Sequence, residues 1–338
     1  MRALWAAYKL VWKRRRLRWR AFRSRHALTT VQDRTADLTP NGIRAFVCLR
    51  NEMMRLPHFL DYYRRLGVSH FLVVDNDSTD GSQAYLEAQT DVSLWTTGAS
   101  YRDARFGLDW MNWLLGRYGH GVWCLLVDVD ELLVYANHDR QDLPALTQWL
   151  DARGQRAFGA LMLDMYARTA LGTADATADP LHILEGFDAR PYRATRQEPL
   201  GNLWVQGGAR DRAFFADEPR RAPTLNKLPL VRWHRRFAFV NSTHSMLPRH
   251  LNFAYDGPGG SAPSGVLLHT KFLPDIVARA EEDLGRRQHF HDPDAFVGYY
   301  EAIRDTPVLW HDGSTRYEGW QQLVRLGLMT DGGFAKQD

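Results

Sequence analysis

The sequence lacks the motifs that mark several large enzyme classes. Its 338 residues include two cysteines, and they contain no CxxC, HExxH, GxGxxG or Walker lysine motif. These absences argue against a zinc hydrolase, a dinucleotide-dependent dehydrogenase and a P-loop ATPase. Two cysteines are also too few for a disulfide scaffold, which favours a reducing cytoplasm.

Long hydrophobic runs and internal repeats are absent too. No stretch approaches the roughly 18 to 20 apolar residues that a membrane-spanning helix needs, and Lys9 and Lys13 interrupt any signal-peptide core. There is no repeat of about 20 to 50 residues, which argues against a solenoid. Since 45% of the residues are hydrophobic and 12% are aromatic, the chain can bury a large core, as an ordinary enzyme does.

Acidic residues are missing from residues 1–32, although this segment holds ten of the 43 Lys and Arg. Five aromatic residues recur there at a spacing that a helix would align along one side, with basic residues on the other sides. The aromatic residues are Trp5, Tyr8, Trp12, Trp19 and Phe22, and the basic residues include Lys9, Lys13, Arg14, Arg16, Arg20 and Arg23.

A helix of this kind would lie in an anionic membrane surface, with its aromatic side chains at the level of the lipid headgroups. We therefore predict that the arm, residues 1–32, attaches peripherally to the cytoplasmic face of the cell membrane. The alternatives are a partner-binding helix, or a basic arm that touches RNA or stays solvated. No nucleic-acid partner is expected.

An apolar run that ends in acid, VWCLLVDVDELLVY at residues 122–135, is the most informative feature. A buried strand there would point Asp128 and Asp130 to the same side, about 7 Å apart at a rise of ~3.3 Å per residue. Two carboxylates at that distance repel by about 2 kcal/mol at an effective dielectric of ~20, so a positive charge is expected nearby. A divalent cation is the simplest candidate, because carboxylate oxygens suit magnesium and manganese. The alternative is a solvated strand end that pairs with arginines.

Residues 43–82 predict a strand, a helix, a second strand and a polar turn, which together make one βαβ unit. The strands are expected at residues 43–49 and 71–74, and the second leads into Asp75 and Asn76. Ligands of open α/β sheets bind at the carboxyl edge of the strands, where these polar side chains would lie. Alternatively, Asp75 and Asn76 only stabilise the turn, by hydrogen bonds to its backbone.

Three early motifs stand at a regular order and spacing: RNE at 50–52, VVDNDSTDGS at 73–82 and LLVDVDEL at 125–132. Together they resemble the motifs of family 2 glycosyltransferases and related enzymes with the GT-A nucleotide-sugar fold. Later blocks are similar to a bacterial branch of that group, which carries DxDE in place of DxD. The resemblance covers residues 43–272, and it departs from the family at Asn76, where a second Asp is usual. The later blocks are QGGARDRAFF at 206–215, NKLPLVRW at 226–233, STHS at 242–245 and LLHTKF at 267–272.

The resemblance implies a set of residues that bind the nucleotide sugar. Short polar side chains would hold the nucleoside, and basic ones would hold phosphate, for which the planar fork of arginine is well suited. The nucleotide-sugar set is Arg50, Asn51, Glu52, Asp75, Asn76 and Asp128, and the phosphate candidates are Arg210, Arg212, Lys227 and Lys271.

The resemblance also implies a metal site. Asp128 and Asp130 would bind Mn²⁺ or Mg²⁺ that bridges the diphosphate, and the ion would neutralise the departing nucleoside diphosphate. His269 is the expected third ligand, with His244 as the alternative. Glu131 would lie on the other face of the strand in a supporting role.

The general base is less well defined by the sequence. An inverting transfer needs a carboxylate that takes the proton of the acceptor hydroxyl. Asp164 follows an apolar strand and Asp211 lies in the Gly-Gly loop, and the two are equal candidates, although neither lies in the ED motif usual for the family. Aromatic side chains that could stack on a sugar, or else belong to the core, are Trp204, Trp233 and Tyr166.

Together these features predict an α/β protein with the GT-A fold, in which helices flank a mostly parallel, Rossmann-like sheet at residues 42–272. The basic arm at 1–32 would precede this domain, and a helical extension at 273–338 would pack on it. The implied activity is metal-dependent, inverting transfer of a sugar from a nucleotide sugar, with a UDP-sugar as the expected donor. The acceptor would be a glycan or glycolipid of cell-surface polysaccharide synthesis. The alternatives are a nucleotidyl- or phosphotransferase, and a noncatalytic relative that binds sugar nucleotides.

Overall fold

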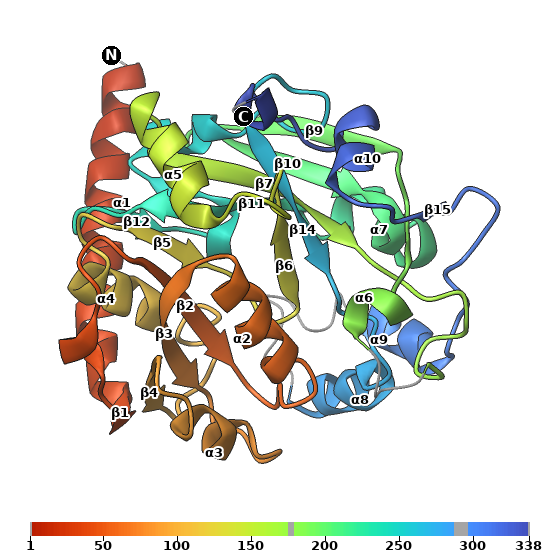
Figure 1. The fold of residues 1–338 in the computed structure, drawn as a ribbon, viewed down its shortest axis with the longest axis horizontal. Helices are drawn as coiled ribbons and strands as arrows, with labels where there is room; N and C mark the ends of the chain where they lie inside the picture. The colour runs from red at the N-terminus through yellow and green to blue at the C-terminus, as the bar shows by residue number, and fades with distance from the viewer. Residues whose placement is uncertain (1, 175–178, 287–296, 337–338) are drawn as a thin grey trace.

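A nine-stranded sheet forms the centre of the computed structural model, which describes residues 2–174, 179–286 and 297–336 (Figure 1). Its strand order is β1-β4-β3-β2-β5-β11-β7-β14-β6. Strands β2, β3, β4, β5, β7 and β14 run in one direction, and β1, β11 and β6 run in the other. The expected α/β architecture with a mostly parallel sheet is therefore confirmed. The strands are β1 (Thr29–Gln32), β2 (Ile43–Leu49), β3 (Val68–Asp75), β4 (Val92–Thr96), β5 (Trp123–Leu126), β6 (Glu131–Val134), β7 (Ala157–Asp164), β11 (Asn226–Arg232) and β14 (Ser264–His269).

Helices and three small two-stranded sheets surround the central sheet. Among the contacts that join the layers, α2 packs on β3, α4 on β2 and β3, and α7 on β7. The helices are α1 (Arg2–Ser24), α2 (Leu56–Arg65), α3 (Ser82–Glu87), α4 (Leu108–Tyr118), α5 (Leu143–Ala152), α6 (Pro180–Ile183), α7 (Gly208–Phe214), α8 (Ile276–Arg286), α9 (Val297–Arg304) and α10 (Trp320–Arg325). The short strands are β8 (Gly186–Phe187), β9 (Tyr192–Gln197), β10 (Asn202–Gly207), β12 (Ala238–Phe239), β13 (Met246–Leu247) and β15 (Thr315–Arg316).

The first βαβ unit forms as the sequence predicts, because its strands are apolar on both faces and its helix is apolar on one. β2 and β3 are almost wholly buried and pair in parallel, with Leu49 opposite Asp75. α2 buries five of its ten residues, and the chain turns after it at Gly67, whose φ of +87° disfavours any residue with a Cβ. This register brings the loop after β2 and the turn after β3 to the same edge of the sheet.

The N-terminal arm is helical, as expected, but it is part of the central domain. α1 packs along α4, and Leu10, Leu17 and Ala21 on one of its sides are buried. The chain then continues into β1, an edge strand that pairs antiparallel with β4. The predicted arm at 1–32 therefore packs on the predicted domain at 42–272.

The other side of α1 is exposed to solvent. Trp5, Tyr8, Trp12 and Trp19 each expose more than half of their surface, and Phe22 is 41% exposed. The helices in the described part of the chain include none that is long and apolar enough to cross a membrane. α1 thus presents a row of aromatic rings without being able to span a bilayer.

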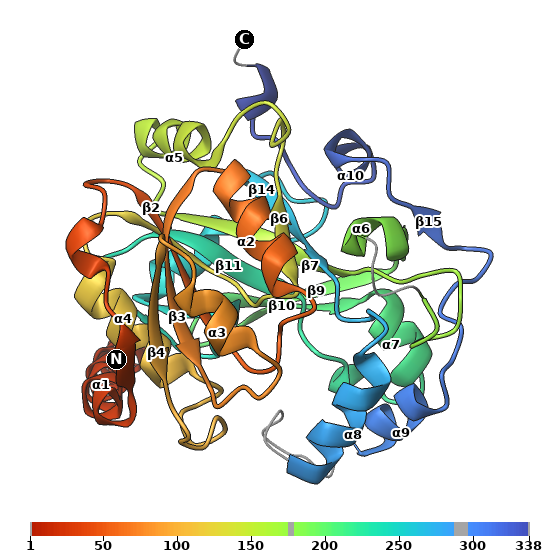
Figure 2. The ribbon, with the colours of Figure 1, turned by 60° about the horizontal axis from the view of Figure 1, so that its bottom comes forward.

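The described parts of the C-terminal extension pack on the central domain. α8 and α9 contact each other, and they lie on the opposite side of the molecule from α1 (Figure 2). β15 pairs with β8, and Phe334 is buried against Trp149. The predicted extension at 273–338 also includes residues 287–296 and 337–338, which lie outside the described residues.

Candidate functional site

The loop after β2 and the turn after β3 are fastened to each other at the carboxyl edge of the sheet. Asn51 Oδ1 accepts a hydrogen bond from the Thr79 N–H at 2.8 Å, and Ser78 Oγ accepts one from the Asn51 N–H at 2.9 Å. Arg50 donates to the carbonyl of Asn76 at 2.8 Å. Arg50, Asn51 and Asn76 thereby border one cavity.

Asp75 and Asn76 have different surroundings. Asp75 is fully buried, its Oδ1 accepts a hydrogen bond from the Ser78 N–H at 2.7 Å, and burial raises its pKa. Asn76 borders the cavity, and its amide donates to the carbonyls of Thr97 and Ala99 at 2.8 and 3.1 Å. Asp75 was expected to contact the nucleotide sugar, but it does not border the cavity, whereas Asn76 does.

Asp128 and Asp130 lie in a turn, and not on a strand as their spacing suggested. β5 ends at Leu126, and β6 begins at Glu131 at the far edge of the sheet order, so residues 127–130 connect two separated strands. The alternation rule that placed both carboxylates on one strand face therefore does not apply. Each carboxylate instead has its own basic partner within the protein.

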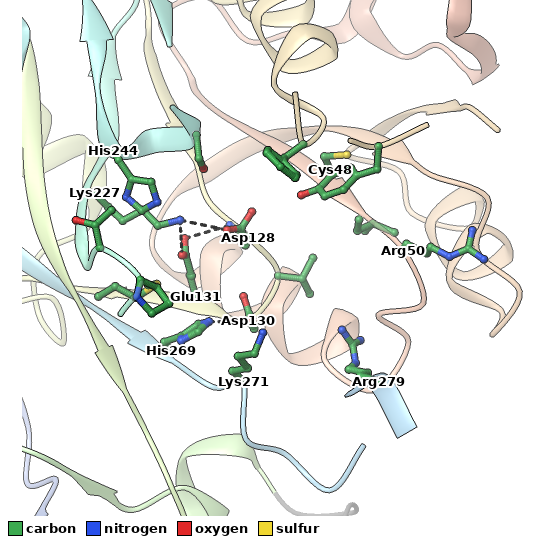
Figure 3. A pocket seen from close by; sticks show the side chains of 18 of the residues that line it. Cys48, Arg50, Asp128, Asp130, Glu131, Lys227, His244, His269, Lys271 and Arg279 are labelled. Atoms are coloured by element: carbon green, nitrogen blue, oxygen red, sulfur yellow. Dashed lines mark hydrogen bonds and ion pairs between the residues drawn. The ribbon is translucent and has the colours of Figure 1, made fainter. Parts of the chain in front are cut away.

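Lys227 on β11 supplies the positive charge beside Asp128. Its Nζ lies 3.2 Å from Asp128 Oδ2 and 2.8 Å from Glu131 Oε1 (Figure 3). The side chains of Lys227 and Glu131 are 5% and 1% exposed, whereas that of Asp128 is 55% exposed. Burial raises the pKa of Glu131 to about 7 although Lys227 opposes this. Desolvation lowers the pKa of Lys227, but the two carboxylates outweigh it and raise that pKa.

His269, at the end of β14, bridges two carboxylates. Its Nε2 lies 3.1 Å from Asp130 Oδ2, and its Nδ1 lies 2.7 Å from Asp164 Oδ1. β14 pairs in parallel with β7, and this register sets His269 directly opposite Asp164. Desolvation lowers the pKa of His269, but Asp130 outweighs it, so the imidazole gains a proton more readily than usual. Burial opposes ionisation of Asp130, but the charge of His269 holds its pKa well below the usual value.

Asp164 is the buried anchor of this arrangement. Besides His269 it accepts a hydrogen bond from Arg210 Nε at 2.8 Å. Burial acts to raise its pKa, but Arg210 and His269 outweigh burial and lower it. A carboxylate held in this way is a weak base, and Asp164 does not border the cavity.

Asp211, the other candidate for the general base, is also committed to an arginine. Its two oxygens lie 2.8 and 2.9 Å from the guanidinium of Arg193, and it does not border the cavity. The structure therefore does not support the expectation that Asp164 or Asp211 is the general base.

A single cavity of about 1150 Å³ joins the strand exits, the acidic turn, the end of β14 and one side of α8. Eleven Lys and Arg side chains border it, against six Asp and Glu. An excess of positive charge over a cavity of this size favours an anionic ligand, and ligand sites of folded enzymes have comparable volumes.

The phosphate candidates divide between the cavity and the protein interior. Arg210, Lys227 and Lys271 border the cavity, whereas Arg212 does not, because Asp188 holds it at 2.8 Å. Within the described ranges, Arg210 Nη2 is buried without a hydrogen-bond partner. An unpartnered buried donor beside a cavity is a group that a ligand oxygen could satisfy.

The aromatic candidates divide in the same way. Trp204 borders the cavity. Trp233 stacks on Phe239 in the core, and Tyr166 is fully buried, so neither is placed to stack on a sugar.

His244, the alternative metal ligand, borders the cavity near Lys227 (Figure 3). Its Nδ1 lies 2.6 Å from the carbonyl of Asn226, which places the proton on Nδ1 and leaves Nε2 as an acceptor. Burial, together with the charge of Lys227, lowers the pKa of His244 to about 3. The imidazole is therefore neutral at physiological pH.

A clamp from α8 was not predicted from the sequence. Arg279 Nη1 lies 2.7 Å from Glu52 Oε1, and Arg279 Nη2 donates to the carbonyl of Asn51 at 2.6 Å. Asp275 accepts two hydrogen bonds from Arg55 at 2.6 and 2.7 Å. Glu52, which was expected to contact the nucleotide sugar, is thus occupied by arginines. Partners more than 200 residues apart leave no local signal in a sequence.

A second wall of the cavity comes from the N-terminal helix. Arg20 Nε donates to Asp109 Oδ2 at 3.0 Å, and Arg105 Nη1 donates to Asp109 Oδ1 at 3.0 Å. Both arginines border the cavity. From the basic pattern of residues 1–32, Arg20 was predicted to face a membrane surface. The packing of α1 on α4 places it at the cavity instead.

Asp130 in the acidic turn and His269 at the end of β14 offer two protein ligands to a divalent cation, a carboxylate oxygen and Nε2, the latter once the imidazole has lost its Nε2 proton. Asp128, which was also expected to bind the ion, is paired with Lys227 instead. Asp164 on the Nδ1 side gives the support that metal-binding imidazoles usually have. In the residues that the structure describes, no group of three or more His, Cys, Asp and Glu is placed to hold a metal. These residues fit an ion that completes its coordination with ligand phosphates, as Mg²⁺ commonly does, rather than a closed protein site.

No family model matches the chain, and no curated protein matches it. Among solved structures, a crystal structure of 4-diphosphocytidyl-2C-methyl-D-erythritol synthase is similar over 42% of this chain and 67% of that chain. The sequence identity is 18% and the TM-score is 0.26. A likeness this weak carries no conclusion about the activity of this chain, which has to be argued from its own residues.

Proposed function

We propose that the chain is a metal-assisted glycosyltransferase of the GT-A type, which transfers a sugar from a nucleotide sugar to a glycan or glycolipid. The observation that carries this proposal is the meeting of three groups in one cavity. The exits of β2 and β3, the acidic turn at 128–131 and the end of β14 at 269–271 all border it. A nucleotide-sugar donor needs such groups in one place, to bind its nucleoside, its diphosphate and the ion that accompanies the diphosphate.

The donor would lie along the carboxyl edge of the sheet. Asn51, Asn76 and Arg50 offer hydrogen-bonding groups to the nucleoside, and Lys271 with the unpartnered Nη2 of Arg210 offers donors to the diphosphate. The charge of Lys271 already acts on Asp130. A UDP-sugar is the expected donor.

Asp130 and His269 would hold Mn²⁺ or Mg²⁺ together with the donor phosphates. The ion, when bound, stabilises the negative charge that develops on the nucleoside diphosphate. In the transfer, the bond between the sugar C1 and the diphosphate oxygen breaks, and its electron pair leaves with the nucleoside diphosphate. The acceptor oxygen forms the new bond to C1, and its proton passes to solvent water. Lys227 pairs with Asp128 and Glu131 and holds both carboxylates in place.

The enzyme would act at a membrane surface through α1. The exposed aromatic row and the excess of basic residues in this helix are the features of helices that lie in an anionic lipid interface. Peripheral attachment at the cytoplasmic face would bring the protein to membrane-bound acceptors for surface polysaccharide.

Donor hydrolysis tests this activity without a known acceptor. With a UDP-sugar and Mn²⁺ we expect slow release of UDP, and we expect Asp130→Ala to lower the rate by about a hundredfold or more. Asp217→Ala, which removes an exposed carboxylate outside the cavity, is the matched control.

The products separate the competing functions. Release of pyrophosphate or of a nucleoside monophosphate would point to a nucleotidyl- or phosphotransferase. Donor binding without any release, in the presence of Mn²⁺ and lipid vesicles, would point to a noncatalytic relative.

A further inference from the structure

The junction of α1 and α4 places two arginines around one buried carboxylate at the cavity wall. The Asp109 side chain is 4% exposed, and the guanidinium groups of Arg20 and Arg105 both lie 3.0 Å from it. Arg20 also donates to the carbonyl of Asp103, and Arg105 to that of Val240. These contacts fix the positions of both guanidinium groups.

Positive charge exceeds negative charge at this junction. Lys13 lies seven residues before Arg20 and therefore on the same side of α1. It is close enough to Arg105 for the two charges to interact. Desolvation, and after it the charge of Arg105, lowers the pKa of Lys13. Asp109 offsets only one of the three cations that meet here. An anion bound to Arg20 and Arg105 would relieve the repulsion that remains.

Other elements form this wall than those that would hold the donor. The donor groups lie on α7 and on loops at the ends of β2, β3, β5 and β14, whereas Arg20 and Arg105 come from α1 and from the loop before α4. A donor diphosphate held at Lys271 and Arg210 leaves Arg20 and Arg105 for a different anionic group.

The exposed surface of α1 indicates which kind of molecule carries this anionic group. Trp19 and Phe22, which flank Arg20 in the sequence, are 59% and 41% exposed and stack on each other. Aromatic side chains of an interfacial helix lie at the level of lipid headgroups. Arg20 would therefore lie at the depth of the phosphate groups, on the flank of α1 that borders the cavity.

On the premise of the proposed glycosyltransferase activity, we infer that Arg20 and Arg105 bind the phosphate of a membrane lipid, which is the acceptor class. The lipid phosphate would enter the cavity from the side of α1, opposite to α8. Arginine suits this role, because its fork binds two oxygens of one phosphate.

A short-chain phospholipid in monomeric form tests the site apart from membrane docking. We expect dihexanoyl phosphatidic acid, below its micellar concentration, to bind the full-length protein in a calorimetric titration. Arg20→Gln should weaken this binding about tenfold, since it removes a charge-assisted pair of hydrogen bonds. Arg20→Lys should recover part of the loss. Arg117→Gln, an exposed arginine of α4 outside the cavity, should leave it unchanged.

Three further measurements decide between the explanations. Binding of inorganic phosphate as tight as that of the short-chain lipid would overturn the lipid assignment. Equal binding by Arg20→Gln and Arg117→Gln would overturn the site itself. UDP binding with Mn²⁺, measured by thermal shift, should be the same in Arg20→Gln and the unaltered protein. Loss of UDP binding in all forms, with lipid binding intact, would count against the glycosyltransferase and not against the phosphate site.

Discussion

Different kinds of interaction stabilise the two halves of the cavity. The exits of β2 and β3 form the first half, and the acidic turn at 128–131 with its partners forms the second. At the exits of β2 and β3, most bonds run between backbone groups and short polar side chains less than 31 residues apart. Around the acidic turn, buried ionic groups from β7, β11 and β14 meet across about 100 residues. One βαβ unit supplies most of the bonds of the first half, to which α8 adds Arg279. The second half exists only once the whole sheet has assembled.

The ionic half itself contains two kinds of buried charge. Arg210 cannot lose its proton at any pH at which proteins are folded. Glu131 can bind a proton, because burial already raises its pKa to about 7. Removing the charged partner of Arg210 should therefore lower the free energy of unfolding by more than removing the charged partner of Glu131. The variants below test this order.

Asp164→Asn should cause the largest loss of stability. It leaves the buried guanidinium of Arg210 and the imidazole of His269 without their carboxylate, and breaking a buried ion pair in this way costs about 3 to 5 kcal/mol. Urea unfolding measures the loss. Asp151→Asn, in the half-exposed pair with Arg232, should cost less than about 1 kcal/mol. Equal losses in the two variants would contradict the proposed anchoring role of Asp164.

Lys227→Met should cost less, about 2 kcal/mol, because Glu131 can bind a proton when its partner is gone. The variant also leaves Asp128 and Glu131 without their internal cation. We therefore expect Mn²⁺ to raise its melting temperature by more than that of the unaltered protein, with excess chelator reversing the effect. Arg117→Met, which removes an exposed cation outside the cavity and keeps the pair of Lys227, is the control. An identical Mn²⁺ response in all three proteins would show that the carboxylates at 128 and 131 do not gain affinity for the ion.

The smallest effect is expected for Asp275, just before α8 at the other half, because Arg55 and Arg279 both keep Glu52 as a second partner. This effect should depend on pH. Burial acts to raise the pKa of Asp275, but Arg55 and Arg279 outweigh it and lower that pKa in the folded state. A lowered pKa contributes stability above the unfolded value of about 3.9, and this contribution is lost as the pH falls through the folded pKa. Asp275→Asn should therefore cost about 1 to 2 kcal/mol at neutral pH. The difference between the two proteins should shrink below about pH 4.

Measurement of the unfolding free energy of both proteins from pH 3 to pH 7 checks this expectation. A difference that stays constant over the whole range would mean that the asparagine acts through lost packing and not through lost charge.

The parts of the site that the sequence predicted are those that depend on local pattern. The strands predicted at 43–49 and 71–74 follow from apolar runs and lie within β2 and β3, and β3 extends three residues further at its start and one at its end. The polar loops at their ends follow from the parallel direction of the two strands. The apolar run before Asp128 likewise identified β5. The alternation argument failed at Asp128 and Asp130, because hydrophobicity does not show where a strand stops within an apolar run that continues through Val127 and Val129.

The partners of these groups could not be predicted, since they come from distant strands. Nothing near Lys227 indicates that it lies against Glu131, and nothing near Asp164 indicates that it binds both His269 and Arg210. Asp164 was predicted at a strand end and lies there, but its neighbours make it an anchor and not a base. Arg212 and Asp211 were assigned from a Gly-Gly loop, whereas Asp188 and Arg193 hold them away from the cavity.

The order of residues along the chain was enough to predict the α/β class, the first βαβ unit, and the chemistry of the residues that gather at one edge of the sheet. These depend on the order of apolar and polar residues along a few turns or strands, which is a property of the chain alone. The tertiary structure decided which acid meets which base, and it placed Arg20 of the first helix in the wall of the cavity. Electrostatic interactions depend on distance in space, so these pairings were fixed only when the strand order β5-β11-β7-β14 and the packing of α1 on α4 were set.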